Sequence, residues 1–439
     1  MTHTAAGTMH VVVIGSGGRE HAVVRALAKS ARTGKITAIP GNSGIAREAA
    51  CVDLDPSDIA AVVAWCTLNA AGYVVVTPDN PLALGMVDAL EAAGIPAFGP
   101  RKAAAQIEAS KAYAKSLMRR YGIPTAVCEV CTESAAALSY ARGWFQKTPA
   151  KPLVVKADGL ALGKGVRICA TFEESARTIE EYMGGRFGES GKTVLLEECL
   201  AGPEVSVLSF CDGTTVVPMI SSMDHKRARD GDEGENTGGM GAVAPNPYYT
   251  PEIAAFCMEK IYRPSVAMLA ACNAPFSGCL YFGLMLTSDG PKVIEYNSRF
   301  GDPEAQTVIP LLESDLLEIM LACTEGRLRP QMVKFSQNAS CCVVLASDGY
   351  PGACETGFPI TGIQAASETA AIYHAATTAR GGQFYNAGGR VLGVSSQAAT
   401  LPAAIKAAYH AAGKIHWQNM YYRRDIGRSV CGAGRISDS

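Results

Sequence analysis

Short apolar runs alternate with helical stretches along the first hundred residues of the chain. Four of these runs are predicted to be strands because they are short and bounded by turn-forming residues, at 11–14, 36–39, 73–76 and 97–98. A helix is predicted between the second and third strands, with Asp55 as its N-cap and Pro56 in its first turn. This alternation is typical of a parallel, doubly wound sheet.

The pattern changes after residue 121. A single connecting helix is predicted over 102–121, ended by Gly122-Ile-Pro124. Thr171 and Glu174 form a capping box for a later helix. Hairpin turns at 212–213 and 288–290 predict antiparallel sheets. Further strands are predicted at 153–157, 166–169, 193–197 and 341–346, and a last helix near 401–412.

The bulk composition excludes several classes of protein. The chain has 439 residues, of which 48% are hydrophobic and 18% charged, with a formal net charge of -2 at pH 7. These values suit a globular multidomain protein and give no basic excess for nucleic acid or an anionic membrane. The 15 cysteines, an odd number without an export signal, predict reduced thiols in the cytoplasm. Asn69 and Gly72 interrupt the apolar stretch 59–76, which therefore predicts no membrane span.

The first predicted strand runs into a glycine loop, Gly15-Ser-Gly-Gly-Arg-Glu20, which opens a helix. Backbone amides and the positive end of a helix dipole suit a phosphate group. A nicotinamide-binding loop needs glycine where Glu20 stands and an acid about 20 residues later, so that alternative is disfavoured. A second alternative, in which the glycine loop is a tight turn that binds no ligand, is left open by these residues. His21 is expected to form hydrogen bonds at the helix start and to have no catalytic role.

A second glycine-rich segment, 156–165, lies between two predicted strands and carries Lys156 and Lys164. It does not open a helix, so it is not a Walker loop. Such a hairpin can fold over a triphosphate and neutralise it, although a mobile solvated hairpin would have the same composition. The glycine-rich loop 224–241 is expected to be an ordered loop of an active site because of its length and mixed charges.

Polar residues alternate along a third segment. On a strand, Glu295 and Asn297 would share one face, with Ile294 and Tyr296 turned into the core. A carboxylate and an amide oxygen suit magnesium, which completes its octahedron with water and nucleotide phosphates. Arg299 could bind a carboxylate or a transferring phosphoryl group. A solvated edge strand would also alternate, but it would not explain the longer motif around these residues.

Together these segments resemble the glycinamide ribonucleotide synthetase family of the ATP-grasp superfamily. The resemblance spans about residues 11–427 and rests on Gly15-Ser-Gly-Gly-Arg-Glu-His-Ala22, Pro40-Gly-Asn42, the 156–165 hairpin, Asp224-His-Lys-Arg227, Asn236-Thr-Gly-Gly-Met-Gly241, Arg299-Phe-Gly-Asp-Pro-Glu304 and Gly388-Gly-Arg-Val-Leu-Gly393.

The resemblance implies an α/β and α+β multidomain fold. It has a Rossmann-like pre-ATP-grasp domain (1–108), an ATP-grasp core (109–328) with a lid lobe at about 124–196, a small C-terminal domain (329–427) and a tail (428–439). It implies ATP-dependent ligation of glycine to 5-phosphoribosylamine through a glycyl phosphate, in de novo purine biosynthesis. ATP and Mg²⁺, with Mn²⁺ as an alternative, would be the cofactors. No nucleic acid, membrane or obligate protein partner is implied, and the location would be cytoplasmic.

The resemblance also implies roles for individual residues. Arg299 and Lys156 would be catalytic, and Glu295 and Asn297 would bind the metal. ATP would contact Lys111, Lys156, Glu197, Glu198, Leu200 and Glu204. The substrates would contact Gly17, Gly18, Arg19, Glu20, Asn42, Pro78, Asp79, Pro81, Asp224, Lys226 and Arg299.

Three positions depart from the family pattern: Asp79 stands where glutamate is frequent, Glu235 where proline is frequent, and Ser298 where cysteine is common. The first is expected to shift a substrate contact by one methylene, and the other two are expected to affect local loop geometry. Three alternatives remain: another ATP-grasp carboxylate–amine ligase, a nicotinamide oxidoreductase, and a catalytically silent nucleotide-binding scaffold.

Overall fold

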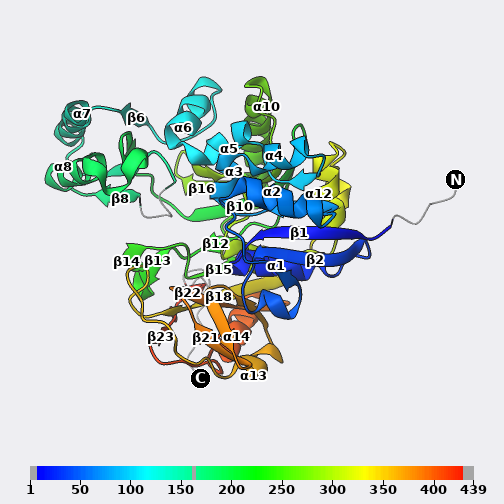
Figure 1. The fold of residues 1–439 in the computed structure, drawn as a ribbon. Helices are drawn as coiled ribbons and strands as arrows, with labels where there is room; N and C mark the ends of the chain where they lie inside the picture. The colour runs from blue at the N-terminus through cyan, green and yellow to red at the C-terminus, as the bar shows by residue number, and fades with distance from the viewer. Residues whose placement is uncertain (1–6, 161–164, 429–439) are drawn as a thin grey trace.

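The computed structural model describes residues 7–160 and 165–428, coloured along the chain in Figure 1. The N-terminal part is a five-stranded parallel sheet in the order β3-β2-β1-β4-β5. Its strands are β1 (Met9–Gly15), β2 (Thr33–Pro40), β3 (Ala50–Cys51), β4 (Tyr73–Val76) and β5 (Ala97–Phe98). The four strands predicted here are confirmed, and β3 adds an edge that was not predicted.

Helices cover both faces of this sheet, namely α1 (Gly18–Leu27), α2 (Ile59–Leu68), α3 (Asp79–Leu84) and α4 (Met86–Ala92). Val11 and Val13 pack into the core on the α1 side, whereas Val12 and Ile14 pack into the core on the α2 side. Successive side chains of a strand point to opposite faces, so a continuous apolar run is what a sheet covered on both faces requires.

Two predicted helix boundaries are wrong for local reasons. The N-cap of α2 is Asp58, whose Oδ1 accepts from the Ala61 amide at 3.0 Å, while Asp55 holds a preceding turn through the Ser57 amide. The predicted single helix 102–121 is divided into α5 (Lys102–Ala109) and α6 (Lys111–Arg120). Ser110 is extended between them and caps α6, because its hydroxyl accepts from the Tyr113 amide at 3.0 Å.

A small lobe projects at the upper left of Figure 1. It consists of a four-stranded antiparallel sheet, β6-β9-β7-β8, with α7 (Ser134–Lys147) and α8 (Phe172–Glu181) on one side. Its strands are β6 (Cys128–Cys131), β7 (Leu153–Ala157), β8 (Val166–Cys169) and β9 (Val194–Glu198). The predicted strands and the Thr171 cap are confirmed. Residues 161–164 of the predicted phosphate hairpin lie outside the described residues.

A second antiparallel sheet, β11-β10-β16-β17, lies beside the small lobe. It contains β10 (Glu204–Asp212), β11 (Val216–Pro218), β16 (Ser277–Thr287) and β17 (Gly290–Asn297), joined by the two predicted hairpin turns. Helices α6, α9 (Pro251–Cys257) and α10 (Arg263–Ala271) contribute to its core. The chain then continues through α11 (Glu304–Val308) and α12 (Leu316–Thr324).

The third large sheet combines two distant parts of the chain. Its path is β12-β15-β18-β22-β19, and β23 pairs with β18. Two of its strands, β12 (Met223–Asp224) and β15 (Gly241–Ala244), flank the 224–241 loop, and the others are β18 (Ala339–Ser347), β19 (Ala371–His374), β22 (Arg390–Ala398) and β23 (Met420–Tyr421). The C-terminal strand β18 therefore pairs directly with β15 at one end of the predicted active-site loop, and β12 at the other end joins the sheet through β15.

Smaller elements complete the C-terminal part, shown in orange and red in Figure 1. They are α13 (Ile363–Ser367), the hairpin of β20 (Thr377–Arg380) and β21 (Gln383–Asn386), and α14 (Leu401–Ala412), which is the predicted last helix. The 224–241 loop itself contains a hairpin of β13 (Arg227–Arg229) and β14 (Glu233–Asn236), which was not predicted. Among the described residues, no helix combines the length and apolar character needed to cross a bilayer.

A pair of buried histidines joins the N-terminal and C-terminal parts. The Nδ1 atom of His21 accepts from the His374 amide at 2.8 Å, and its Nε2 lies 3.1 Å from Glu48 Oε1. Because Nδ1 accepts, the neutral ring carries its proton on Nε2 and donates it to Glu48. The prediction that His21 forms hydrogen bonds at the helix start is therefore confirmed.

The two buried histidines are expected to make the folded protein less stable in mild acid. Burial lowers the pKa of His21, and burial with the nearby His21 and Arg25 lowers the pKa of His374 to about 3. In the unfolded chain both bind protons near pH 6.5, so stability falls as the pH drops from about 6.5 towards 3. At pH 5 the loss from His374 alone is expected to be about 2 kcal/mol relative to pH 8.

Urea unfolding at pH 8 and pH 5 measures this loss. The variant His374→Asn is expected to lose about 2 kcal/mol less than the wild type between these two values. The exposed His410 supplies the control, because His410→Asn should leave the difference unchanged. An equal difference in wild type and His374→Asn would contradict the prediction.

Candidate active site

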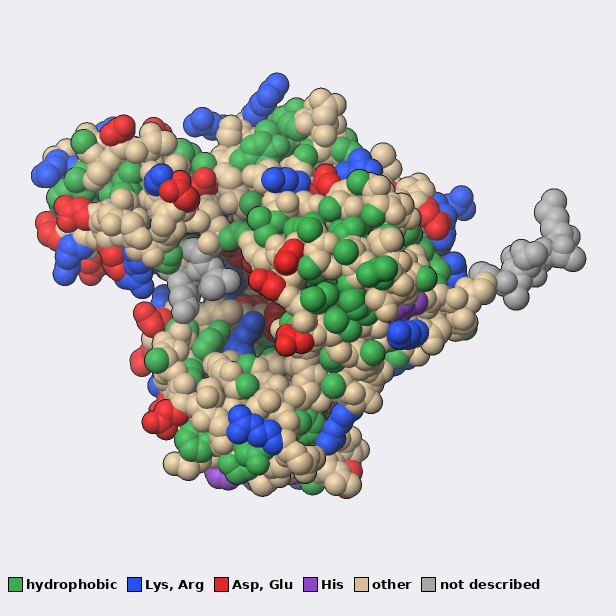
Figure 2. All heavy atoms as spheres, in the orientation of Figure 1, with side chains coloured by type: hydrophobic (Ala, Val, Ile, Leu, Met, Phe, Trp, Pro, Cys, Tyr) green, Lys and Arg blue, Asp and Glu red, His purple; other side chains and the backbone are tan. Residues whose placement is uncertain are grey.

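A cavity of about 970 Å³ lies between the small lobe, the β10–β17 sheet and the C-terminal part. Figure 2 shows the surface hollowed beside the small lobe, with acidic and basic side chains in and around the hollow. Most residues predicted for the site line this cavity: Arg19, Asp79, Lys111, Lys156, Glu197, Glu198, Leu200, Glu204, Asp224, Lys226, Glu295, Asn297 and Arg299. Segments more than 250 residues apart in the chain are thus brought together.

Six predicted substrate residues are not among those that line the cavity: Gly17, Gly18, Glu20, Asn42, Pro78 and Pro81. Glu20 is 2% exposed, and its carboxylate accepts from the Gly17 amide, the Thr77 hydroxyl and Arg19 Nε, each at 2.6 Å. The Glu20 side chain thus braces the first glycine loop, and its predicted contact with the substrate stays a prediction. The side chain of Asn42 braces neighbouring backbone in the same way, through Ser16 and Gly44.

Two lysines flank one carboxylate in the wall formed by the small lobe. Glu197 Oε2 lies 2.9 Å from Lys156 Nζ and 3.1 Å from Lys115 Nζ, and all three side chains are almost fully buried. Burial alone would raise the pKa of Glu197, but the two ammonium groups outweigh it and hold the pKa below its ordinary value. The Glu197 side chain therefore positions these two lysines through Oε2, and its predicted contact with adenine stays a prediction.

Lys115 was missed by the sequence interpretation. It lies four residues after Lys111 on α6, and residues at this spacing share one face of a helix. This spacing of four residues was the feature of the sequence from which Lys115 could have been predicted. Burial lowers the pKa of both lysines.

The candidate metal ligands lie together on β17. Glu295 and Asn297 both line the cavity, as their spacing predicts. The expected burial of Ile294 is wrong: Gly283 pairs with Glu295 and Leu284 with Val293, so a bulge excludes Ile294 from the ladder and turns it to the cavity wall. Tyr296 is buried as expected, at 3% exposure.

The cationic side chains around the Glu295 carboxylate suit a ligand that carries several negative charges together with a bound metal cation. Lys226 Nζ lies 2.9 Å from Glu204 Oε2 and 3.7 Å from Glu295 Oε1. Burial would raise the pKa of Glu295, but Lys226, Lys156 and other nearby cations outweigh it and lower the pKa, so the carboxylate is ionised.

No group of three or more His, Cys, Asp or Glu side chains able to hold a metal occurs among residues 7–160 and 165–428. A site of one carboxylate and one amide fits magnesium, which takes its remaining oxygens from water and phosphate. It does not fit a structural zinc site, which needs four nitrogen or sulfur ligands.

Arg299 follows directly after the metal-ligand pair. Its Nη2 donates to Asn297 Oδ1 at 3.1 Å and lies 2.9 Å from Glu108 Oε1, and its Nη1 donates to the Phe300 carbonyl at 3.1 Å. Glu108 was not predicted, because it lies in a different helix far away in the chain. Ser298, the position that departs from the family pattern, contacts this same carboxylate with its hydroxyl at 2.8 Å.

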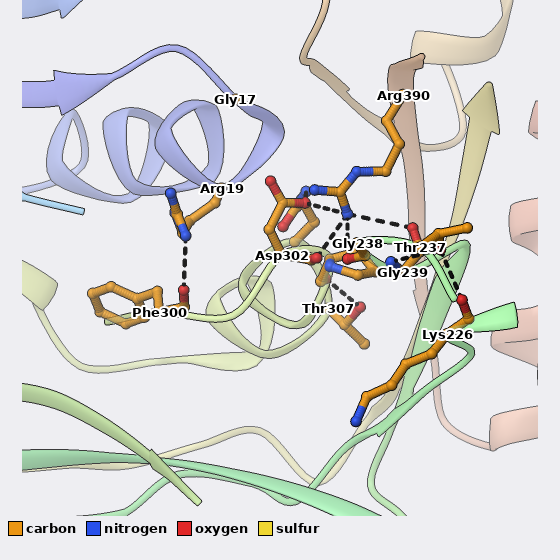
Figure 3. A network of polar contacts seen from close by, with 12 residues as sticks. Gly17, Arg19, Lys226, Thr237, Gly238, Gly239, Phe300, Asp302, Thr307 and Arg390 are labelled. Carbon is orange, nitrogen blue, oxygen red and sulfur yellow. Dashed lines mark hydrogen bonds and ion pairs between the residues drawn. The ribbon is translucent and has the colours of Figure 1, made fainter. Parts of the chain in front are cut away.

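Arg390, the first residue of β22, ties the C-terminal sheet to two loops at the cavity (Figure 3). Its Nη1 donates to the carbonyls of Gly238 at 2.6 Å and Asp302 at 2.7 Å, and it lies 3.4 Å from Asp302 Oδ1. The Gly388–Gly393 motif contained this arginine, but no role was predicted for it. Arg19 donates to the carbonyl of Phe300, which lies in the loop that also contains Asp302.

Asp224 carries an unpaired carboxyl oxygen in the cavity wall, as far as the described residues show. Its Oδ1 is buried and has no hydrogen-bond partner within 7–160 and 165–428, and burial with the nearby Glu304 raises its pKa well above the ordinary range. Gly239 packs against it with a φ of +109°, and a Cβ there would lie 2.7 Å from Asp224 Oδ1. Any larger residue would therefore displace the carboxyl group, which explains a glycine at this place in the loop.

The cavity thus combines buried cations, a pair of metal-type oxygens and unsatisfied carboxyl groups. Lysines at two walls can neutralise a polyphosphate, while Glu295 and Asn297 can hold a hard cation against it. Such an arrangement performs phosphoryl transfer mainly by positioning its ligands and stabilising charge.

Comparisons with known proteins agree with this geometry. Family models described as Phosphoribosylglycinamide synthetase match residues 9–108 (N domain), 109–305 (ATP-grasp (A) domain) and 340–429 (C domain). A protein named phosphoribosylamine–glycine ligase from Rhizobium meliloti (strain 1021) is 45% identical over 419 residues, which are 95% of this chain and 98% of that protein. One from Nostoc sp. (strain PCC 7120) is 45% identical over 96% of this chain and 100% of its own length.

Solved structures show the same likeness. The crystal structure of phosphoribosylamine–glycine ligase from Thermotoga maritima covers 95% of this chain and 100% of its own, at 33% identity and a TM-score of 0.81. The biotin carboxylase domain of Hydrogenobacter thermophilus 2-oxoglutarate carboxylase has a TM-score of 0.70 at 19% identity, with 94% and 91% of the two chains covered, a likeness of fold alone.

Proposed function

Because the chain belongs to the phosphoribosylglycinamide synthetase family, we infer that it is a ligase that joins glycine to 5-phosphoribosylamine at the expense of ATP. The product is glycinamide ribonucleotide, an intermediate of purine biosynthesis. The observation that supports this function best is one cavity that unites the lysines, the Glu295 and Asn297 pair, Arg299 and the edge of the first glycine loop.

We propose that ligation proceeds in two steps through glycyl phosphate. A carboxylate oxygen of glycine attacks the γ-phosphorus of ATP, and the bond from that phosphorus to the β,γ-bridging oxygen breaks to release ADP. The ribosylamine nitrogen then attacks the acyl carbon, loses a proton, and phosphate leaves. Both attacking groups belong to the substrates, so the protein contributes position, charge and exclusion of water.

The cavity residues support a division of labour in this reaction. Lys111 and Lys156 would neutralise the ATP phosphates, and the 197–200 segment with Glu204 would hold the nucleoside. Arg299 would bind the carboxylate of glycine or its phosphorylated form. Asp79, Asp224 and Lys226 would face the amine substrate, with Arg19 at the edge of the first glycine loop.

The reaction uses ATP with a divalent metal. We propose Glu295 and Asn297 as its protein ligands, with magnesium as the ion and manganese as an alternative. The ion would neutralise charge on the nucleotide phosphates. We also propose a cytoplasmic location and the division at residues 108, 328 and 427, with a tail at 428–439 of which 429–439 lie outside the described residues.

An assay of phosphate release across substrate pairs tests the function. We expect release with glycine and 5-phosphoribosylamine to exceed that with alanine and 5-phosphoribosylamine, or with glycine and ammonia, by about 100-fold or more, since pairs that lack a bound group lose binding energy in the transition state. Faster release with another acid and amine would instead identify a different ATP-grasp carboxylate–amine ligase. Mass spectrometry of the ligated product supplies an independent readout.

A further inference from the structure

Glu108 is a buried carboxylate that no step of the proposed reaction uses. It lies in the last turn of α5, is 8% exposed and has the apolar neighbours Ile107 and Ala104 on the same helix. An ionised carboxylate in such surroundings is costly unless charged or polar donors satisfy it. The groups that contact the Glu108 carboxylate therefore indicate its role.

Within the described part of the chain, two successive residues directly after β17 supply the polar contacts of this carboxylate. Oε2 accepts from the amide and from the hydroxyl of Ser298, both at 2.8 Å, and Oε1 lies 2.9 Å from Arg299 Nη2. The contact spans 190 positions of the chain, from a helix beside the N-terminal sheet to the β17 strand end. We call this set of contacts the Glu108 clamp.

The clamp fixes the direction of Arg299. The same Nη2 that meets Glu108 also donates to Asn297 Oδ1 at 3.1 Å, and Nη1 donates to the Phe300 carbonyl at 3.1 Å. The guanidinium is thus held by these three acceptors, and Glu108, Asn297 and Arg299 all line the cavity. Without Glu108, Asn297 and the Phe300 carbonyl alone would hold the group, and both are neutral.

We propose that Glu108 is a positioning residue for ligation, acting through Arg299, and that the Ser298 hydroxyl supports it. The negative charge of Glu108 pairs with Arg299 Nη2 and so holds the guanidinium in a fixed direction at the cavity, where it can bind an anionic ligand. The same contact sets the Asn297 amide, because Arg299 donates to its oxygen. This inference rests on the proposed function, since it assigns Arg299 to the reacting carboxylate.

The variant Glu108→Gln keeps the shape of the side chain and removes its charge. We expect kcat for ligation to fall about 10- to 100-fold, as is usual when a residue that orients a catalytic group is changed. KM for ATP should stay within about twofold, because Lys111 and Lys156 are untouched. Ser298→Ala removes one of three donors and should have a smaller effect in the same direction.

A double-mutant cycle with Arg299→Met distinguishes positioning from a general structural role. If Glu108 acts through Arg299, then Glu108→Gln should change kcat less than about twofold in the Arg299→Met background. A structural role would instead reduce kcat by the same factor in both backgrounds, which would overturn the proposal. Glu91→Gln is the matched control, because Glu91 forms an exposed pair with Arg101 outside the cavity.

A crystal structure of Glu108→Gln tests the positioning role of the Glu108 clamp without any measurement of enzyme activity. The expected result is a guanidinium of Arg299 beyond hydrogen-bond distance of Asn297 Oδ1, and an Arg299 that has not moved would overturn the proposal. Wild-type protein without ligase activity would refute the proposed function, while the crystal structure would still decide whether Glu108 positions Arg299.

Discussion

Replacing Glu295 with glutamine is expected to lower kcat by about 10³-fold or more, equivalent to ~4 kcal/mol of transition-state stabilisation. Glutamine keeps the length of the side chain and one neutral oxygen, but it removes the only charge in the proposed metal pair. It also removes the carboxylate that lies 3.7 Å from Lys226, which would leave that ammonium paired with Glu204 at 2.9 Å. The two losses act on the same charge-rich part of the cavity.

The fold should survive this change, because the Glu295 side chain is 32% exposed and glutamine keeps its size. Measuring kcat by phosphate release over a magnesium titration, with thermal unfolding alongside, separates the two effects. Glu259→Gln, at a 71% exposed glutamate outside the cavity, should behave as wild type. Wild-type turnover in Glu295→Gln at low magnesium would reject the metal assignment.

Hydrophobic patterning was sufficient for most of the fold. Strand β4 is a continuous apolar run because both faces of its sheet are covered, and hairpin turns marked the antiparallel sheets. The matches to N, ATP-grasp and C domain models confirm the predicted architecture. The break at Ser110 was missed because Asp158, on a distant loop, accepts from the Ala112 amide at 2.7 Å and so stabilises a new helix start.

The candidate site was predictable where its chemistry is local. Glu295 and Asn297 share a strand face, and this spacing is visible in the sequence. Glu108 and Arg390 were missed because they act on residues more than 80 positions away, and no local pattern reveals such contacts. Ile294 shows the opposite error, because strict alternation predicts its burial and only a bulge in the pairing with β16 reverses it.

Glu197→Gln is expected to cause the largest loss of stability, about 3–5 kcal/mol at pH 7, because it removes one partner of a buried ion network. Lys115 and Lys156 are each 5% exposed, and both lie within 3.1 Å of the Glu197 carboxylate. The variant would leave two ammonium groups buried against each other. Glu198→Gln is the matched control, because its 26% exposed side chain meets Lys292 and should change stability by about 1 kcal/mol or less.

The origin of this loss can be tested by removing one of the two positive charges. In Glu197→Gln the buried lysines would have lowered pKa values in the folded state, so the unfolded chain binds more protons and stability should rise with pH. Adding Lys115→Met to Glu197→Gln should restore part of the stability at pH 7 while keeping Lys156 for ATP. Urea unfolding from pH 7 to pH 9 measures both effects. A pH-independent loss that Lys115→Met does not reduce would show that packing, not charge, is the function of Glu197.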